Sequence, residues 1–410
     1  MREDTSTTTR RDSTERTDAA RTPSAGGGAR TLGRRSVLVG GAALVAGAGL
    51  LDPARASAAG AALADTAMPT SSGDLSPAQQ VGQRVIWSYP GLTPPASLVD
   101  AIHAGLVGGV IFFGENIDRN NRSQIQAVTR DLAQAQADSG VGYPLLLMTD
   151  QEGGVVQRLP GAPGISEKQV GQSLHPVDTA QTMGTGTALN LLDAGVSCNL
   201  APVLDVYRVA GNFDDRFGRS YSMDPVVCGQ CGAASVTAQQ RLRVATTAKH
   251  FPGLGAATVD ENTDLGPVVL DVSASDLRSI DELPFRYAID AKVDMVMTSW
   301  ATYPALDPDL PAGISPTIVQ GELRGRLGYR GVTITDAIEA GALQAFGDTG
   351  QRAVRAATAG MDIVLCSARD VTQGQAAVDA LEAALAGGQL DAVEASDALK
   401  RVLQMRSRLG

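Results

Sequence analysis

The sequence predicts an α/β protein whose folded part is a single (β/α)8 TIM-type barrel. Eight short apolar runs rich in β-branched residues recur along the chain, and segments with helical spacing separate them. The last helical segment is 395–409, and we expect no second domain after the barrel. Eight apolar strands alternating with helices in roughly 330 residues indicate a parallel sheet that is covered by helices and closes on itself. The runs are 84–87, 109–113, 145–149, 196–204, 244–249, 293–298, 332–335 and 363–366.

The main alternative is a doubly wound open sheet. Such a fold usually carries a Gly-x-Gly-x-x-Gly turn after a strand, and none of the runs is followed by one. The first helix has a clear start. Ser76 is a suitable N-cap, Pro77 suits the first helical position, and Gln79 completes a capping box. The sequence therefore favours a barrel that begins near residue 76.

The amino-terminal region predicts an export signal. Arg34 and Arg35 precede an apolar run, 37–51, that is too short and glycine-rich to span a bilayer. The small residues 56–58 form a suitable cleavage site, and the paired arginines indicate the twin-arginine route. We therefore expect a secreted or extracytoplasmic protein that has no stable membrane insertion once the signal is cleaved. We expect the chain to divide into a disordered leader with its signal (1–58), a linker (59–75) and the barrel (76–410).

Charge and cysteine usage exclude several classes of function. The formal net charge is −10, and the body of the chain has no basic patch, so we expect no nucleic-acid partner. Cys228 and Cys231 have the spacing of a redox motif, but no thioredoxin-like pattern surrounds them and no second pair supports zinc. We expect a local disulfide or two free thiols there. The isolated histidines offer no ligand cluster, so we expect no metal or cofactor. We also expect a monomer.

Polar residues follow several of the predicted strands. Because the carboxyl ends of barrel strands meet at one mouth, these side chains are expected to lie close together. They are Asp150 after the third run, Asp205 and Arg219 after the fourth, Lys249 and His250 at the end of the fifth, Trp300 after the sixth and Asp336 after the seventh. Carboxylates and cations that bind hydroxyls, with an aromatic face beside them, suit a sugar. A different chemistry is also open, because a lysine on a barrel strand is able to form a Schiff base.

Six ordered motifs carry a specific resemblance. The segments are TDQEGGVVQR, LAPVLDV, RFGRSY, KHFPGLG, YPALDP and GVTITDA. In this order they resemble the amino-terminal barrel of glycoside hydrolase family 3, and most closely its bacterial β-N-acetylglucosaminidases. The resemblance covers about residues 76–408. It implies a retaining mechanism in which Asp336 is the nucleophile, while Asp150, Arg219, Lys249 and His250 bind the terminal sugar.

The sequence departs from that family pattern at the general acid/base. The resembling enzymes usually have Lys-His-Phe-Pro-Gly-His-Gly and then Asp-Ser-His, whereas this chain has Leu254 and then 260–262, Asp-Glu-Asn. Asparagine cannot transfer a proton. His103 is expected at a helix end and His175 after a loop, so neither is expected to replace the missing histidine. A carboxylate of the same segment is the expected substitute. The candidates are Asp264, which we favour, Glu261 and Asp260.

The expected function is that of an exported retaining β-glycosidase. The expected substrates are terminal N-acetylglucosaminides of cell-wall or chitin fragments, cleaved through a glycosyl-aspartate intermediate. Specificity for β-glucosides is an alternative. A catalytically impaired sugar-binding protein is another, because the usual acid/base is missing.

Overall fold

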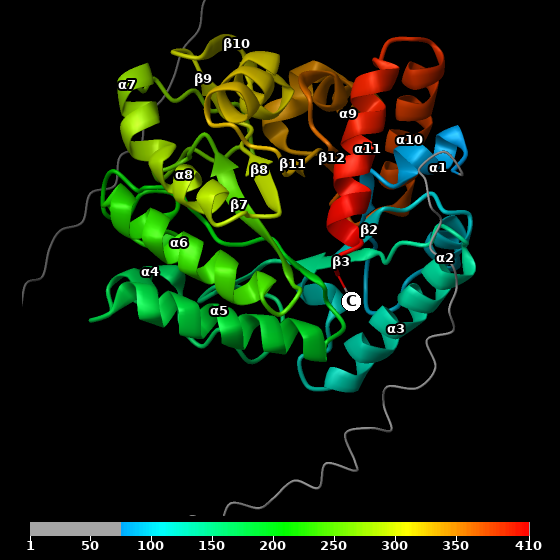
Figure 1. The fold of residues 1–410 in the computed structure, drawn as a ribbon, viewed down its shortest axis with the longest axis horizontal. Helices are drawn as coiled ribbons and strands as arrows, with labels where there is room; N and C mark the ends of the chain where they lie inside the picture. Colours follow the sequence, from blue (N-terminus) through cyan, green and yellow to red (C-terminus); the bar gives the residue numbers. More distant parts are fainter. Residues whose placement is uncertain (1–74, 410) are drawn as a thin grey trace, which may run out of the picture. The chain divides into compact units, whose positions relative to one another are not determined.

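The computed structural model describes residues 75–409, and it confirms the predicted barrel. Eight parallel strands close in the order β1-β12-β11-β8-β7-β6-β3-β2 (Figure 1). They are β1 (Val85–Trp87), β2 (Gly109–Phe112), β3 (Leu146–Thr149), β6 (Cys198–Asn199), β7 (Ala245–Phe251), β8 (Met295–Thr298), β11 (Val332–Ala337) and β12 (Ile363–Leu365). Each of the eight apolar runs contributes one of these strands.

The fourth strand is much shorter than the run 196–204 that predicted it. Only Cys198 and Asn199 pair as β6. Pro202 has no N–H to donate to a ladder, and beyond it the pairing is reduced to a bridge between Val203 and Lys249. An apolar run therefore located the strand, but it did not show where the ladder ends.

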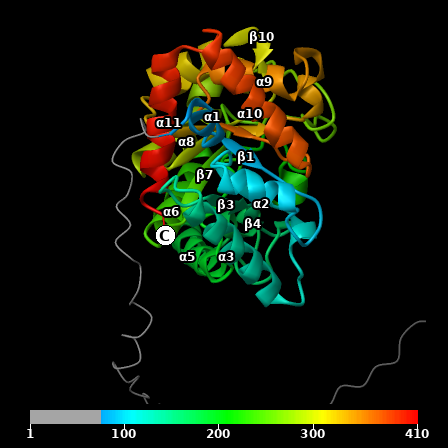
Figure 2. The same ribbon diagram turned by 90° about the vertical axis from the view of Figure 1, so that its right-hand side faces the viewer.

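Helices surround the barrel (Figures 1 and 2). The α-helices are α1 (Pro77–Gly82), α2 (Ala96–His103), α3 (Arg122–Asp138), α4 (Glu167–Gly171), α5 (Pro176–Asp193), α6 (Pro225–Gln240), α7 (Ala274–Asp276), α8 (Leu283–Asp290), α9 (Thr349–Ala359), α10 (Val371–Ala386) and α11 (Ala392–Arg406). Short 3-10 and π helices are η2 (Gly114–Asn116), η3 (Asp215–Phe217), η4 (Leu277–Asp281), η5 (Ala312–Ile314), η6 (Thr317–Arg326) and η7 (Gly341–Phe346). Two small hairpins lie outside the barrel: β4 (Gln151–Gly153) with β5 (Val156–Gln157), and β9 (Thr302–Tyr303) with β10 (Asp307–Pro311).

The predicted start of α1 is confirmed. The backbone N–H of Gln79 donates to Ser76 Oγ over 3.2 Å, and the Ser76 N–H donates to Gln79 Oε1 over 3.0 Å. This capping box satisfies two N–H groups that the first helical turn would otherwise leave without partners.

Apolar side chains fill both the inside of the barrel and the layer between strands and helices. Ile86, Met148, Met295 and Ile334 belong to the inner cluster, and all four are fully buried. Because the strands are buried on both faces, their sequences are continuously apolar rather than alternating. All four cysteines are buried free thiols, and Cys228 and Cys231 lie within helix α6.

The predicted leader and signal (1–58) lie outside the described residues, as does all of the predicted linker except Leu75. Between residues 75 and 409, no helix is both long and apolar enough to cross a bilayer.

Candidate active site

A polar cavity of about 240 Å³ opens at the carboxyl ends of the barrel strands. Its wall brings together six residues that the sequence singled out: Asp150, Arg219, Lys249, His250, Asp264 and Asp336. They come from five different segments of the chain. The closure of the barrel is what places them at one mouth.

An ion-pair network occupies one side of the cavity. Lys249 Nζ lies 2.9 Å from Asp150 Oδ1 and 2.8 Å from Glu152 Oε1. Arg219 binds Glu152 with two parallel bonds, of 2.9 Å from Nε and 3.0 Å from Nη2. Such bidentate pairs fix the orientation of the guanidinium group. The network therefore holds the cations Lys249 and Arg219 and their carboxylate partners in fixed positions along the cavity wall.

Mutual charge keeps these buried groups ionised. Burial alone would raise the pKa of Glu152, but Arg219 and Lys249 lower it to about 2. Burial likewise opposes the charge of Lys249, yet Asp150 and Glu152 raise its pKa above the usual value. A lysine held in the ammonium form is a poor nucleophile, because Schiff-base chemistry needs the free amine. The arrangement thus disfavours the aldolase-like alternative.

His250 is oriented by a buried carboxylate. Its Nδ1 lies 2.7 Å from Asp205 Oδ2, and Asp205 Oδ1 accepts the backbone N–H groups of His250 and Leu254. Burial would lower the pKa of His250, but Asp205 raises it above the usual value. The Asp205 carboxylate therefore stabilises the protonated form of the ring relative to a buried histidine without such a partner.

Asp336 is the second-to-last residue of strand β11 and lines the cavity. Its Oδ1 accepts the N–H of Ala337 over 2.7 Å, a bond that fixes the rotation of the carboxylate. The expectation that Trp300 lies in the mouth of the barrel beside the sugar is wrong. The Trp300 ring is 1% exposed, packs in the core outside the cavity, and donates its Nε1–H to the carbonyl of Ala337 over 2.8 Å. It stabilises the segment that carries Asp336 from behind.

The three candidate acid/base residues lie in one loop but in different places. Only Asp264 lines the cavity, whereas Asp260 and Glu261 do not. Glu261 accepts the N–H of Thr258 over 2.6 Å and so closes a local turn. Asp264 is an exposed residue at the rim of the cavity, yet the protein on its inner side raises the pKa of its carboxyl group, and the negative charge of Asp336 raises it further. A carboxyl group in this setting is suited to donate a proton.

Sequence reasoning did not identify Glu152 as a site residue, and it placed Asp205 at the mouth without giving it a role. Glu152 lies two residues after Asp150, and this spacing puts both on one side of an extended strand. That spacing was an available signal. Asp214 was also missed. Its Oδ1 lies 3.5 Å from Arg219 Nη1, and burial and the neighbouring Asp205 raise its pKa to about 7.

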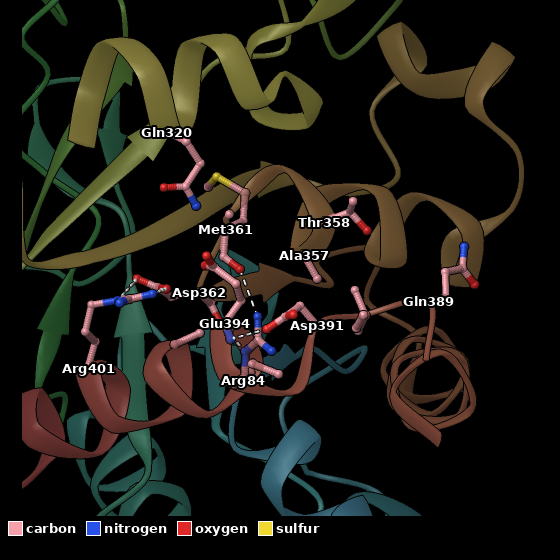
Figure 3. A pocket seen from close by; sticks show the side chains of 14 residues that line it. Arg84, Gln320, Ala357, Thr358, Met361, Asp362, Gln389, Asp391, Glu394 and Arg401 are labelled. Atoms are coloured by element: carbon pink, nitrogen blue, oxygen red, sulfur yellow. Dashed lines mark hydrogen bonds and ion pairs between the residues drawn. The ribbon is translucent and has the colours of Figure 1, made fainter. Parts of the chain in front are cut away.

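A second cavity, of about 260 Å³, is lined by residues at the opposite, amino ends of the strands (Figure 3). Arg84 donates there to the carbonyls of Met361 and Asp362, each over 2.9 Å. The Asp362 carboxylate pairs with Arg324 and Arg401, each at 2.7 Å. These bonds connect the amino ends of strands β1 and β12 with helix α11. This end of a barrel serves stability rather than chemistry.

Within the described part of the chain, no three His, Cys, Asp or Glu side chains are grouped as a metal ion would require.

Comparison with known proteins decides the family. Residues 79–405 match the sequence profile of the glycosyl hydrolase family 3 N terminal domain. The chain belongs to glycoside hydrolase family 3. The resemblance that the six motifs indicated is therefore confirmed.

Family 3 relatives match over most of this chain. A protein named "Uncharacterized secreted glycosyl hydrolase" from Arthroderma benhamiae is 48% identical, over 84% of this chain and 96% of that protein. Beta-hexosaminidase A of Pseudoalteromonas piscicida is 31% identical, over 77% of this chain and 56% of the enzyme. The chain thus spans little more than half of that relative.

Solved structures of family 3 share the fold. A family 3 β-N-acetylglucosaminidase from Paenibacillus sp. str. FPU-7 superposes with a TM-score of 0.76 at 33% identity, over 82% of this chain and 62% of that one. A β-N-acetylhexosaminidase from Beutenbergia cavernae superposes with a TM-score of 0.73 at 36% identity, over 82% of this chain and 99% of that one. The barrel described here therefore matches the Beutenbergia enzyme over nearly the whole length of that enzyme.

Proposed function

We propose that this family 3 protein is an exported retaining β-N-acetylhexosaminidase that releases terminal N-acetylglucosamine from cell-wall or chitin fragments. One observation carries the proposal. Two carboxylates with different surroundings, Asp336 and Asp264, line the same cavity as the cations Lys249, Arg219 and His250. The names of the bacterial relatives support the substrate class. The Arthroderma relative is called secreted, which supports export.

Asp336 attacks the anomeric carbon in the first step. The bond between that carbon and the leaving oxygen breaks, and a glycosyl ester forms on the Asp336 carboxylate. Asp264 donates its proton to the leaving oxygen, which departs as a neutral alcohol. In the second step Asp264 takes a proton from water, and the resulting nucleophile attacks the same carbon and frees Asp336.

The electrostatics of the pair suit both steps. The negative charge of Asp336 helps to keep Asp264 protonated before the reaction. Ester formation neutralises Asp336, so that the pKa of Asp264 falls just when a base is needed. One neighbouring charge therefore switches Asp264 from acid to base.

The ion-pair network positions the sugar. Asp150, Lys249, Arg219 and His250 offer charged hydrogen-bond partners along one wall of the cavity. Charge-assisted bonds to hydroxyl groups are stronger and more directional than neutral ones. These four residues bind the terminal sugar with its anomeric carbon toward Asp336.

Asp336→Asn tests the proposal. Wild type and variant are assayed on a panel of nitrophenyl β-glycosides that includes N-acetylglucosaminide and glucoside. We expect hydrolysis of the N-acetylglucosaminide by wild type, loss in the variant, and labelling of Asp336 by a slow fluorosugar substrate. Equal background rates on every sugar would contradict hydrolysis, and sugar binding without turnover would then indicate a binding protein. Preference for the glucoside would overturn the substrate class alone.

A further inference from the structure

The loop that carries Asp264 is held against the segment that follows Asp336. The N–H of Gly341 donates to the carbonyl of Asp264 over 2.9 Å, and the N–H of Ala342 donates to the carbonyl of Thr263 over 3.0 Å. Gly341 lies only five residues after Asp336. One short stretch of chain therefore bears the nucleophile and also binds the backbone of the acid/base candidate.

These two backbone bonds, together with the buried side chain of Thr263, connect the loop to the barrel. Residues 258–266 are all described, and their other hydrogen bonds stay within the loop. Leu265 is 79% exposed and adds little packing. The position of the Asp264 carboxylate thus depends on how closely the loop approaches residues 341 and 342.

The close approach requires a glycine at position 341. A Cβ built there would lie 2.5 Å from both the carbonyl carbon and the oxygen of Leu265, and 2.8 Å from the oxygen of Asp264. These are backbone atoms, so no side-chain rotation relieves the contact, and the loop itself must move. The backbone conformation of Gly341 is not left-handed, so close contact is the reason for the glycine.

We propose that Gly341 is a positioning residue that sets the distance between Asp264 and the reacting glycosidic oxygen. This inference rests on the proposed acid/base role of Asp264. Gly341 has no functional group and acts only through the backbone of the loop. Its role should therefore appear in steps that need proton transfer and be absent from steps that do not.

Gly341→Ala tests the role through the choice of leaving group. Acid/base catalysis contributes about 10²–10⁴-fold, and displacement of Asp264 should remove part of it. For an alkyl or disaccharide substrate, whose leaving group needs a proton, we expect kcat/KM to fall by about 10-fold or more. For a dinitrophenyl glycoside, whose leaving group departs without help, we expect kcat/KM to change less than about 3-fold. Equal losses on both substrates would overturn the proposal.

Gly266→Ala is the matched control. Gly266 lies in the same loop, and a Cβ built there meets nothing within 4 Å. It adds the same methyl group without pushing on residues 341 and 342. We expect it to keep the wild-type ratio of rates on the two substrates. A Gly266→Ala ratio that shifts as far as that of Gly341→Ala would also overturn the proposal.

A longer carboxylate should partly restore the Gly341→Ala enzyme. Asp264→Glu adds one methylene, which overreaches in wild type but compensates for a loop that has moved outward. We expect the double variant to cleave the disaccharide faster than the product of the two single effects predicts, the sign of a coupled pair. Simple multiplication of the two losses would show that Gly341 supports the fold alone.

Two further measurements keep the test decisive. If Gly341→Ala is insoluble, Ala342→Pro removes the other N–H at a helix start that tolerates proline, and it should shift the rate ratio in the same sense. An unchanged ratio in that soluble variant would count against the proposal.

Asp264→Asn separates the acid/base role of Asp264 from the positioning role of Gly341. If it shows no dependence on leaving group, the acid/base assignment fails. If it does and Gly341→Ala does not, only the present inference fails.

Discussion

The carboxylate of Asp205 lies 2.7 Å from Nδ1 of His250 and also accepts two backbone N–H groups around it. This single carboxylate therefore fixes both the ring and the backbone of a residue that lines the cavity. Asp205 is fully buried, and among residues 75–409 its ion-pair partner is the ring of His250. Any change to the Asp205 carboxylate therefore alters both the charge and the position of His250.

The pair predicts a pH dependence with a definite sign. Asp205 raises the pKa of His250, so the stabilising pair is fully present below the ordinary imidazole value of about 6.5 and is lost as the pH rises through the raised value. We expect KM for the sugar to increase above that pH. In Asp205→Asn, burial is no longer opposed by the carboxylate, so the same increase should begin at lower pH.

KM measured from pH 5 to 9 checks this expectation, and NMR titration of the His250 ring reports the pKa directly. The exposed Asp178 on helix α5 gives a matched control, and Asp178→Asn should keep the wild-type profile. An Asp205→Asn profile with an unshifted midpoint would show that the carboxylate does not control the charge of His250.

The barrel was predictable because burial on both faces gives its strands a continuous apolar signature. The placement of Lys249 and Asp336 followed from this, since residues at the carboxyl ends of barrel strands meet at one mouth. Pairings between loops were not predictable in the same way. The bidentate bond of Arg219 to Glu152 joins residues 67 positions apart, and no local pattern encodes it.

Trp300 shows a different limit. It lies two residues after the end of strand β8, but this position does not reveal which way the ring turns. The ring packs into the core because Ala337 offers a carbonyl to its N–H and apolar neighbours surround it. Gly341 is similar, because a glycine needed for close contact looks in the sequence like any other of the 46 glycines.

Glu152→Gln should destabilise the protein as well as impair it. The change leaves buried Lys249 and half-buried Arg219 without one shared negative charge, and breaking a buried pair in this way costs about 3–5 kcal/mol. A lower Tm and a higher KM are expected. Because the pKa of Glu152 is lowered to about 2, the stabilisation is present above the ordinary glutamate value and is lost as the pH falls toward 2.

Thermal unfolding across pH 2–7 measures that effect. Asp397→Asn serves as its control, because it removes an exposed pair with Lys400 at 2.9 Å that solvent screens. Its Tm should equal that of wild type near neutral pH. A Glu152→Gln protein as stable as this control would mean that the network contributes nothing net to folding.

Asp264→Asn should leave an enzyme that still forms the glycosyl ester from activated substrates. Without a base the ester hydrolyses slowly, so a burst of dinitrophenol followed by a slow phase is expected. Azide needs no deprotonation, and it should accelerate the slow phase and yield a β-glycosyl azide. Stopped-flow absorbance and analysis of the product test this. Glu261→Gln, outside the cavity, should show neither the burst nor the azide effect. Equal behaviour of the two variants would exclude Asp264 as the acid/base.

Asp362→Asn should separate stability from catalysis. Asp362 is fully buried at the amino ends of the strands, where its carboxylate pairs with Arg401 (Figure 3). The same carboxylate also pairs with Arg324 and accepts the N–H of Thr333. Its neutralisation leaves two guanidinium groups short of a partner, so Tm should fall by several degrees.

The catalytic mouth lies at the other end of the same strands, so kcat/KM of Asp362→Asn measured well below its Tm should stay within about 2-fold of wild type. The comparison with Glu152→Gln is informative because both changes neutralise a buried carboxylate that binds two cations. If Asp362→Asn lost as much kcat/KM as Glu152→Gln, buried charge anywhere in the barrel would be sufficient to explain the loss. The position of Glu152 in the cavity would then carry no special meaning for catalysis.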